Sequence, residues 1–232
     1  MSDQKSAHED YEPPYLFPDY RSTELRAPTH RPVRLPDDWF HVAEGPVFGR
    51  IPVRAEDADL TRQHAGEPLG ERIVVSGQVT DSDGRAVRNT LVEIWQANAA
   101  GRYLDPVDDH EAPLDPNFTG AGRCLTDDEG QYRFVTVKPG AYPWRNHANA
   151  WRPAHVHFSL FGPSLASRLV TQMYFPGDPL LPLDPILGSI PDERGRTLLV
   201  SKFDLETTIP EWALGYRWDI VVRGRRGTPR ER

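Results

Sequence analysis

The sequence predicts an all-β protein, a two-sheet antiparallel β-sandwich with long loops and an extended N-terminal arm. Short segments alternate apolar and polar residues with period two, and turn-forming residues separate them. Proline is frequent, with 23 residues beside 18 glycines, which argues against long helices over most of the chain. A length of 232 residues fits a single β domain of this kind.

Six segments carry the strand pattern. In residues 71–80, Ile73, Val75, Gly77 and Val79 fall at alternating positions before a turn at 81–84. In residues 89–97, Glu93 falls on one face and Ile94 on the other. The other predicted strands are 131–137, 154–161, 168–175 and 216–224, and a helix is predicted near 192–206.

The chain is expected to divide into an arm and a domain. Residues 1–69 are rich in Pro, Arg and Asp without sustained periodicity, and we expect an arm that contacts another subunit, with a disordered tail over 1–12. Residues 70–232 form the predicted sandwich domain. Within it, 98–127 and 138–153 are predicted as long loops, and long loops in a compact domain are often functional.

Charge and cysteine usage exclude several classes of protein. A formal net charge of −7 gives no reason to expect nucleic acid or an anionic membrane as a partner. One cysteine, Cys124, permits no intrachain disulfide and excludes a disulfide scaffold. The polar N-terminus lacks the apolar stretch of a signal peptide, and no segment is long enough to span a bilayer, so a cytoplasmic protein is expected.

Residues 151–160, WRPAHVHFSL, carry two histidines at alternating positions of a predicted strand. Alternation puts His155 and His157 on one face, while Val156 and Phe158 share the other, core-facing side. Side chains two apart on one face are separated by about 6.6 Å at Cα, which suits two imidazoles converging on one metal ion. Two exposed or hydrogen-bonded histidines explain most such pairs, so the pattern alone is weak.

The pair by itself leaves the metal open among zinc, copper, nickel and iron. A cupin barrel would add a glutamate four or five residues later, where this chain has Phe161 and Gly162. A third zinc ligand could come from His147 or from the acidic run 108–111, although both are more typical of solvated loops. Cys124 is more typical of a buried structural thiol than of a ligand.

Long, ordered motifs between residues 70 and 226 resemble the intradiol ring-cleavage dioxygenases. They are rich in rare residues such as Trp, which makes the resemblance specific; Trp95, inside one of them, fits the core at least as well as the site. The arm resembles the family more loosely, through FPDYRST (17–23). The motifs are LVEIWQANAAGRY (91–103), APLDPNF (112–118), GRCLTDDEGQYRF (122–134), KPGAYPWRN (138–146), WRPAHVHFSL (151–160), TQMYFPGDPL (171–180) and DPILGSIP (184–191).

The resemblance implies a non-haem ferric ion, Fe(III), held by two tyrosinates and two histidines, with no organic cofactor. It assigns Tyr142 and His157 as the axial ligands, and Tyr103 and His155 as the equatorial ones beside a hydroxide. A single tyrosine is more often a core side chain, but here four ligand types match in order. Phenolate is a hard anionic oxygen donor, which stabilises iron(III) over iron(II).

Five further residues receive roles from the resemblance. Arg152 matches an active-site arginine whose guanidinium stabilises developing negative charge, and Gln172 matches a polar residue near the same ring. Trp144 and Ile186 match pocket walls that hold the ring flat. Tyr20 matches a residue near a substrate carboxylate.

The implied reaction is cleavage of a catechol ring by O2 between its two hydroxyl-bearing carbons, with no reductant consumed. The implied substrate is protocatechuate (3,4-dihydroxybenzoate), converted to 3-carboxy-cis,cis-muconate in the β-ketoadipate pathway of aromatic catabolism. The family enzyme combines unlike α and β chains, so an α-type subunit is the expected partner of this iron-bearing chain. Two alternatives stay open: another substituted catechol or hydroxyquinol as substrate, and a non-catalytic β-sandwich binding module.

Overall fold

The computed structural model describes residues 11–26, 29–31, 52–144, 151–162, 168–224 and 226–231. Its strands are β1 (Arg72–Thr80), β2 (Leu91–Trp95), β3 (Ala121–Leu125), β4 (Gln131–Val137), β5 (Tyr142–Pro143), β6 (Trp151–Arg152), β7 (His155–Phe161), β8 (Leu169–Tyr174), β9 (Lys202–Phe203), β10 (Leu214–Arg217) and β11 (Ile220–Val221). Its helices are α1 (Thr23–Arg26), α2 (Pro185–Gly188) and α3 (Glu193–Leu198), with 3₁₀ turns η2 (Ala55–Ala58), η3 (Leu60–Arg62) and η4 (Leu181–Leu183).

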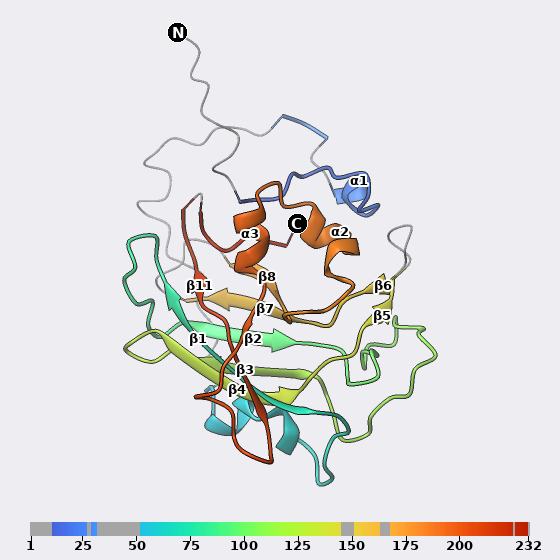
Figure 1. Ribbon diagram of the computed structural model, residues 1–232, viewed down its shortest axis with the longest axis vertical. Coiled ribbons are helices and arrows are strands. Elements are labelled where there is room, and N and C mark those ends of the chain that lie inside the picture. Colours follow the sequence, from blue (N-terminus) through green and yellow to red (C-terminus); the bar gives the residue numbers. More distant parts are fainter. Residues whose placement is uncertain are drawn as a thin grey trace.

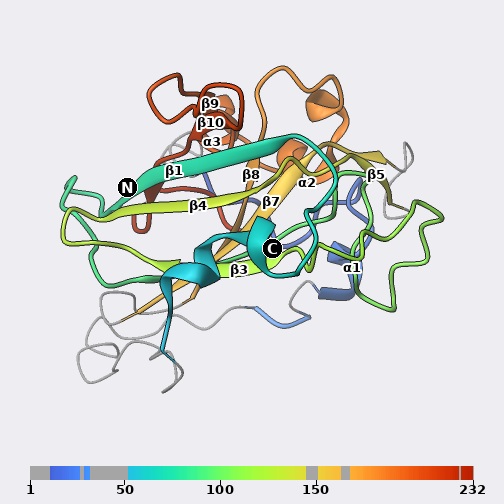
Figure 2. The ribbon, with the colours of Figure 1, turned by 90° about the horizontal axis from the view of Figure 1, so that it is seen from below.

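Two sheets form the body of the molecule (Figures 1 and 2). One has the strand order β11-β1-β10-β9, with β4 also paired to β1, and the other has the order β3-β2-β7-β8. All pairs of the second sheet are antiparallel, whereas β1 runs parallel to β10 and β11. The predicted all-β sandwich is confirmed.

The core lies between the sheets, where apolar side chains of the inward faces meet. Phe158 of β7 is fully buried, with its ring centroid 5.7 Å from that of Phe134 and 4.7 Å from that of Trp218. The alternation predicted for β2 is present, since Ile94 is buried and Glu93 is not. In β7 the histidine-bearing face is buried as well, although the pattern had marked only the opposite face for the core.

Two regions predicted as loops contain strands. The predicted loop 98–127 includes β3, whose sequence AGRCL lacks period-two alternation. Gly122 of β3 packs where a Cβ would overlap the side chain of Leu60. Close packing, rather than burial of an apolar side chain, therefore requires glycine at this position. The predicted loop 138–153 includes β5 and β6, which form a two-stranded ribbon.

The C-terminal third departs from prediction in two details. The strand predicted at 216–224 is divided into two short strands, β10 and β11, and the break begins at Trp218. The Trp218 backbone N–H donates to the Ser76 carbonyl at 2.8 Å. The helix predicted near 192–206 is only α3, because the chain returns to strand at β9. The Asp192 side chain caps α3 by accepting from the Arg194 N–H.

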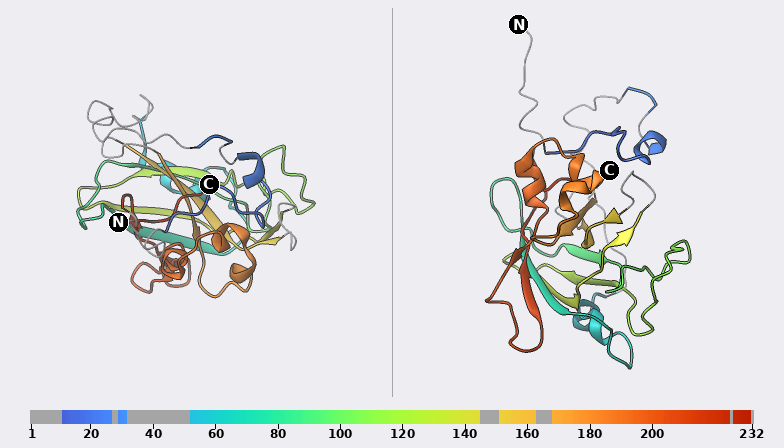
Figure 3. Two further views of the ribbon diagram at one scale, coloured as in Figure 1. Left: turned by 90° about the horizontal axis from the view of Figure 1, so that it is seen from above. Right: turned by 45° about the vertical axis from the view of Figure 1, so that its right-hand side comes forward.

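The helices α2 and α3 lie beside the β8 side of the sandwich, and α1 lies apart from them at the same end of the molecule (Figures 1 and 3). The ribbon of β5 and β6 leads directly into β7, so one end of this sheet collects side chains from many segments. Within the described ranges, no helix combines the length and the apolar character needed to cross a bilayer.

Candidate metal centre and active site

The two histidines of β7 converge at their Nε2 atoms, which lie 3.2 Å apart. Both side chains are buried. His155 Nδ1 lies 2.8 Å from the Pro153 carbonyl oxygen, and only a protonated Nδ1 can donate to that acceptor. The Arg152 guanidinium, which can only donate, lies 3.2 Å from His155 Nε2. His155 Nε2 therefore carries a lone pair rather than a proton.

His157 is fixed on two sides. Its ring stacks on Trp95, with centroids 4.8 Å apart and planes 2° from parallel. Its Nδ1 lies 3.2 Å from Glu231 Oε2. Burial is the largest influence and would raise the pKa of the Glu231 carboxyl, but His157, Arg152 and Gln172 together outweigh it, and the pKa lies below its usual value. When the carboxylate accepts from Nδ1–H, the lone pair of a neutral His157 imidazole lies at Nε2.

In their neutral forms the two imidazoles present facing lone pairs at 3.2 Å, and these repel unless a proton or a metal ion lies between them. Metal–nitrogen bonds of about 2.1 Å, at right angles to each other, would place two nitrogens about 3 Å apart. The histidine arrangement therefore fits a bound metal ion.

Two tyrosines approach the histidines from other segments. The Tyr142 hydroxyl lies 3.4 Å from His155 Nε2, and the Tyr103 ring centroid is 5.5 Å from that of Tyr142 and 6.4 Å from that of His157. Within the described part of the chain, the buried Tyr103 hydroxyl has no hydrogen-bond partner. An orphaned buried hydroxyl is costly, and a metal ion would satisfy it.

Burial favours the neutral forms of Tyr103, Tyr142 and His155. Burial, followed by the charge of Tyr142, raises the pKa of Tyr103 well above its usual value. Burial also raises the pKa of Tyr142, although Arg152 opposes the effect. Burial and Arg152 lower the pKa of His155 well below its usual value. A highly charged metal ion would reverse this balance by drawing the protons from the phenols.

The local sequence explains how the tyrosines reach the site. Asn98 Oδ1 accepts from two following backbone N–H groups and shapes a turn before Tyr103. Gly101, at φ +80°, completes that turn where a Cβ would overlap the Ala141 carbonyl. Tyr142 pairs across the β5–β6 ribbon with Arg152, three residues before His155, where the histidine strand begins.

Arg152 is fully buried and has several polar partners. Its Nη2 donates to Gln172 Oε1 at 2.6 Å, to the Tyr174 hydroxyl at 3.0 Å and to Asp184 Oδ2 at 2.8 Å. The sequence analysis named Gln172 but missed Tyr174 and Asp184, both within quoted motifs. A signal for Asp184 was present in the sequence. An aspartate directly before a proline is typical of the cap of a helix, and such a residue is held in a fixed position.

The predicted ring-holding residues lie around this guanidinium. Arg152 lies over the Trp144 ring at 5.2 Å, and the Tyr20 ring is 5.2 Å from Trp144. Arg26, which the sequence analysis did not assign, lies over Tyr20 at 4.6 Å. Ile186 is buried in α2, and its N–H donates to Asp184 Oδ1 at 2.9 Å. The same carboxylate therefore holds both the arginine and the helix that carries Ile186.

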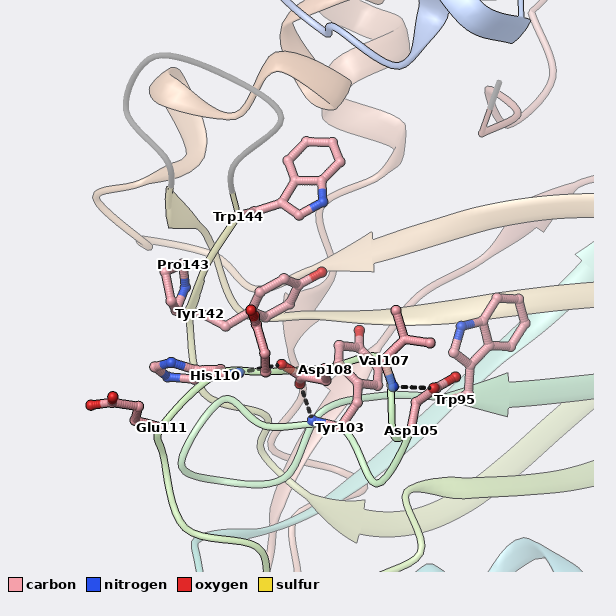
Figure 4. A pocket seen from close by; sticks show the side chains of 11 residues that line it. Trp95, Tyr103, Asp105, Val107, Asp108, His110, Glu111, Tyr142, Pro143 and Trp144 are labelled. Atoms are coloured by element: carbon pink, nitrogen blue, oxygen red, sulfur yellow. Dashed lines mark hydrogen bonds between the residues drawn. The ribbon is translucent and has the colours of Figure 1, made fainter.

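A cavity of about 950 Å³ opens beside the tyrosines (Figure 4). Of the predicted site residues, Tyr103, Tyr142 and Trp144 line it. Trp95 lines it as well, so this residue belongs to the site and not only to the core. The remaining lining residues are Pro143, Asp105, Val107, Asp108, Asp109, His110 and Glu111.

The acidic run 108–111 belongs to the cavity wall rather than to a metal site. Asp108 accepts from the Tyr103 N–H at 2.8 Å and from the His110 N–H at 3.0 Å, which ties the loop to the tyrosine (Figure 4). Across the described ranges, no three His, Cys, Asp or Glu side chains gather as metal ligands. His147, the other candidate for a zinc ligand, lies outside the described residues.

Comparison with known proteins agrees with the fold. A family profile described as Dioxygenase matches residues 43–224, and one described as Protocatechuate 3,4-dioxygenase beta subunit N terminal matches residues 12–37. The chain belongs to the intradiol ring-cleavage dioxygenase family, which is iron-dependent. The resemblance inferred from the motifs is confirmed.

The relatives include both chains of one enzyme type. The chain is 60% identical to the protocatechuate 3,4-dioxygenase beta chain of Burkholderia cepacia, over 95% of this chain and 94% of that one. It is 32% identical to the alpha chain of Pseudomonas putida, over 67% and 73%. Among solved structures, chlorocatechol 1,2-dioxygenase from Pseudomonas putida superposes with a TM-score of 0.53 at 25% identity, covering 77% of this chain and 70% of that one.

Proposed function

We propose that this chain is the iron-bearing, β-type subunit of an enzyme that cleaves protocatechuate between its two hydroxyl-bearing carbons. The product is 3-carboxy-cis,cis-muconate, formed in aromatic catabolism through the β-ketoadipate pathway. The observation that carries the proposal is 60% identity over 95% of the chain to the Burkholderia cepacia beta chain. A metal-compatible set of two histidines and two tyrosines beside a cavity supports it.

We assign Tyr103, Tyr142, His155 and His157 as the ligands of Fe(III). The assignment is supported by the facing lone pairs of the histidines and by the orphaned Tyr103 hydroxyl. Two phenolates favour the ferric over the ferrous ion, because they are hard anionic donors. When bound, iron(III) supplies a Lewis-acid centre at which a catechol becomes reactive towards O2.

The chain's own groups then move protons and orient the ring. Tyr142, whose hydroxyl already lies near His155 and Arg152, is the base that takes a catechol proton at its Oη. Arg152 stabilises negative charge that develops on the ring, and its buried partners hold the guanidinium in place before substrate arrives. Gln172 completes that support.

Trp144, Ile186 and Tyr20 define where the ring and its carboxylate bind. The Trp144 ring lies close to both the Arg152 guanidinium and the Tyr20 ring, so in this proposal it forms a flat wall beside the charged group. Tyr20 with Arg26 over its ring provides a donor and a positive charge for the substrate carboxylate. This pairing favours a carboxylated catechol over catechol itself.

We further propose that the active assembly contains an α-type chain, with one iron per αβ unit. The support is the similarity to alpha chains from Pseudomonas putida and Burkholderia cepacia, each at 32% identity. In this proposal residues 1–69 form an arm for subunit contacts and 70–232 form the catalytic domain. A cytoplasmic location is supported by the single cysteine, which is free and buried.

Product analysis tests the proposed reaction. The chain, co-expressed with its α-type partner, is incubated with protocatechuate, catechol or hydroxyquinol under ¹⁸O2, and products are identified by mass spectrometry. We expect 3-carboxy-cis,cis-muconate carrying two labelled atoms, with the highest kcat/KM for protocatechuate. Faster turnover of hydroxyquinol would replace the proposed substrate, and the absence of any ring-opened product from a folded complex would refute the enzyme assignment.

A further inference from the structure

The last described residues, 226–231, return to the candidate metal centre. The Thr228 N–H donates to the Val221 carbonyl at 3.0 Å, and the Pro229 carbonyl accepts from Thr171 Oγ1 at 2.7 Å. The Glu231 N–H then donates to the Val170 carbonyl of β8 at 2.8 Å. The tail is therefore docked by backbone bonds that do not involve the Glu231 side chain.

This docking delivers a carboxylate to one histidine only. Glu231 Oε2 lies 3.2 Å from His157 Nδ1, and the glutamate side chain is 20% exposed. The corresponding Nδ1 of His155 bonds instead to the neutral carbonyl of Pro153. The two histidines thus differ in the group behind them, although they share a strand and a face.

We propose that Glu231 is a positioning residue that fixes the His157 tautomer and makes its Nε2 the stronger donor of the pair. The inference rests on the proposed role of His157 as an iron ligand. A carboxylate behind a ligating imidazole raises its basicity and fixes the ring orientation, and a neutral carbonyl does so less. Stacking on Trp95 sets the plane of the His157 ring. The hydrogen bond to Glu231 then has only to fix the orientation of the His157 ring within that plane.

The test uses the co-expressed αβ complex loaded with iron and two variants. Glu231→Ala removes both the charge and the acceptor, whereas Glu231→Gln keeps an acceptor of the same size without the charge. The readouts are the rate of iron loss to an excess of chelator and the wavelength of the tyrosinate-to-iron band. The tail bonds made by main-chain atoms are retained in both variants, and circular dichroism verifies folding.

We expect Glu231→Ala to lose iron at least about tenfold faster than the unmodified complex. Its band should move to longer wavelength, because a weaker imidazole donor leaves the metal more electron-poor. Glu231→Gln should fall between the two. If Glu231→Ala does not fold, Glu231→Gln alone decides, through the same two readouts.

The matched control is Glu93→Gln in β2. Glu93 pairs with Ser159 of β7, two positions along the strands from the pair formed by Trp95 and His157. Glu93 bonds to Arg168 and Ser159 and does not contact His157. It should leave iron release and the band unchanged. Unaltered release and spectrum in both Glu231 variants, or equal effects of Glu93→Gln, would overturn the inference. An unmodified complex that binds no iron would instead refute the proposed ligand set.

Discussion

Arg152 is the residue with the most demanding surroundings in this site. Its guanidinium is buried with a fully buried carboxylate, Asp184, at 2.8 Å, and it also reaches Gln172, Tyr174 and His155. Planar geometry lets one side chain donate to several acceptors at once, which an ammonium cannot reproduce. Its position is therefore set before substrate binds, as electrostatic stabilisation of a developing charge requires.

Arg152→Lys tests this role. The substitution keeps the positive charge, so Asp184 retains a charged partner. It loses the planar set of N–H donors with which the guanidinium reaches several acceptors at once. We expect kcat to fall about 100-fold at a temperature where circular dichroism shows the variant folded, and the thermal unfolding midpoint to fall as well, because buried acceptors lose their donors. Arg168→Lys, at a half-exposed arginine bonded to Glu93, is the matched control and should retain full activity. Equal kcat values for Arg152→Lys and the unmodified complex would contradict the assigned role.

At the scale of elements, the meeting of β1 with the β10–β11 segment decides whether the first sheet forms. Gly77 lies where a Cβ would overlap the Trp218 carbonyl oxygen, which also accepts from the buried Tyr132 hydroxyl at 2.6 Å. The crossing strand segment can approach this closely only at a glycine.

Gly77→Ala should therefore lower the free energy of unfolding by about 2 kcal/mol or more, because backbone must shift to admit the methyl group. Gly188→Ala in α2, where an added Cβ meets nothing within 4 Å, is the control and should be neutral or slightly stabilising. Guanidinium unfolding of both variants measures the difference. Equal free energies of unfolding for the two variants would show that the backbone near Gly77 can accommodate a methyl group, which would contradict the prediction.

The strand β3 carries a buried thiol whose ionisation is linked to stability. Burial raises the pKa of Cys124 from 9.0 to about 12. Since the unfolded chain loses this proton first, the linked stability is present below pH 9 and is lost as pH rises from 9 towards 12. Between pH 8 and pH 10 the protein should therefore lose about 1.4 kcal/mol more stability than Cys124→Ala does. Parallel pH dependences of the two proteins would contradict the burial of this thiol.

Most elements were predictable from the sequence because strands with one apolar face obey a period of two. The strand β3 was not, since Gly122 was selected for close packing against Leu60 and leaves no alternation to read. At the site, the four proposed metal ligands could be predicted because each lies in a long motif shared with the family. The contributions of Asp184 and Glu231 could not be predicted. Their importance depends on partners 32 and 74 residues away, which only the folded chain brings near.

At the scale of the whole molecule, negative charge gathers where the substrate must enter. The chain has a net charge of −7, and the loop 105–111 places several carboxylates on the cavity wall (Figure 4). Protocatechuate is itself an anion, so these groups should slow its approach, and salt should screen the effect.

Glu111→Gln should accordingly raise kcat/KM for protocatechuate about twofold at low ionic strength. The gain should disappear at about 1 M salt, where the screening length is short. Glu206→Gln removes an exposed charge outside the cavity wall and serves as the control. Steady-state kinetics at two salt concentrations measure both variants, and a gain that persists at high salt would show a cause other than charge.

The visible spectrum and iron content of the co-expressed αβ complex test the central claim most directly. The proposed two-tyrosine, two-histidine site predicts a red-brown protein with one iron per αβ unit and a tyrosinate-to-iron band that changes on adding protocatechuate. Tyr142→Phe should alter the band and slow turnover. A folded complex that is colourless and free of iron, or a Tyr142→Phe variant with unchanged spectrum and kinetics, would contradict the account.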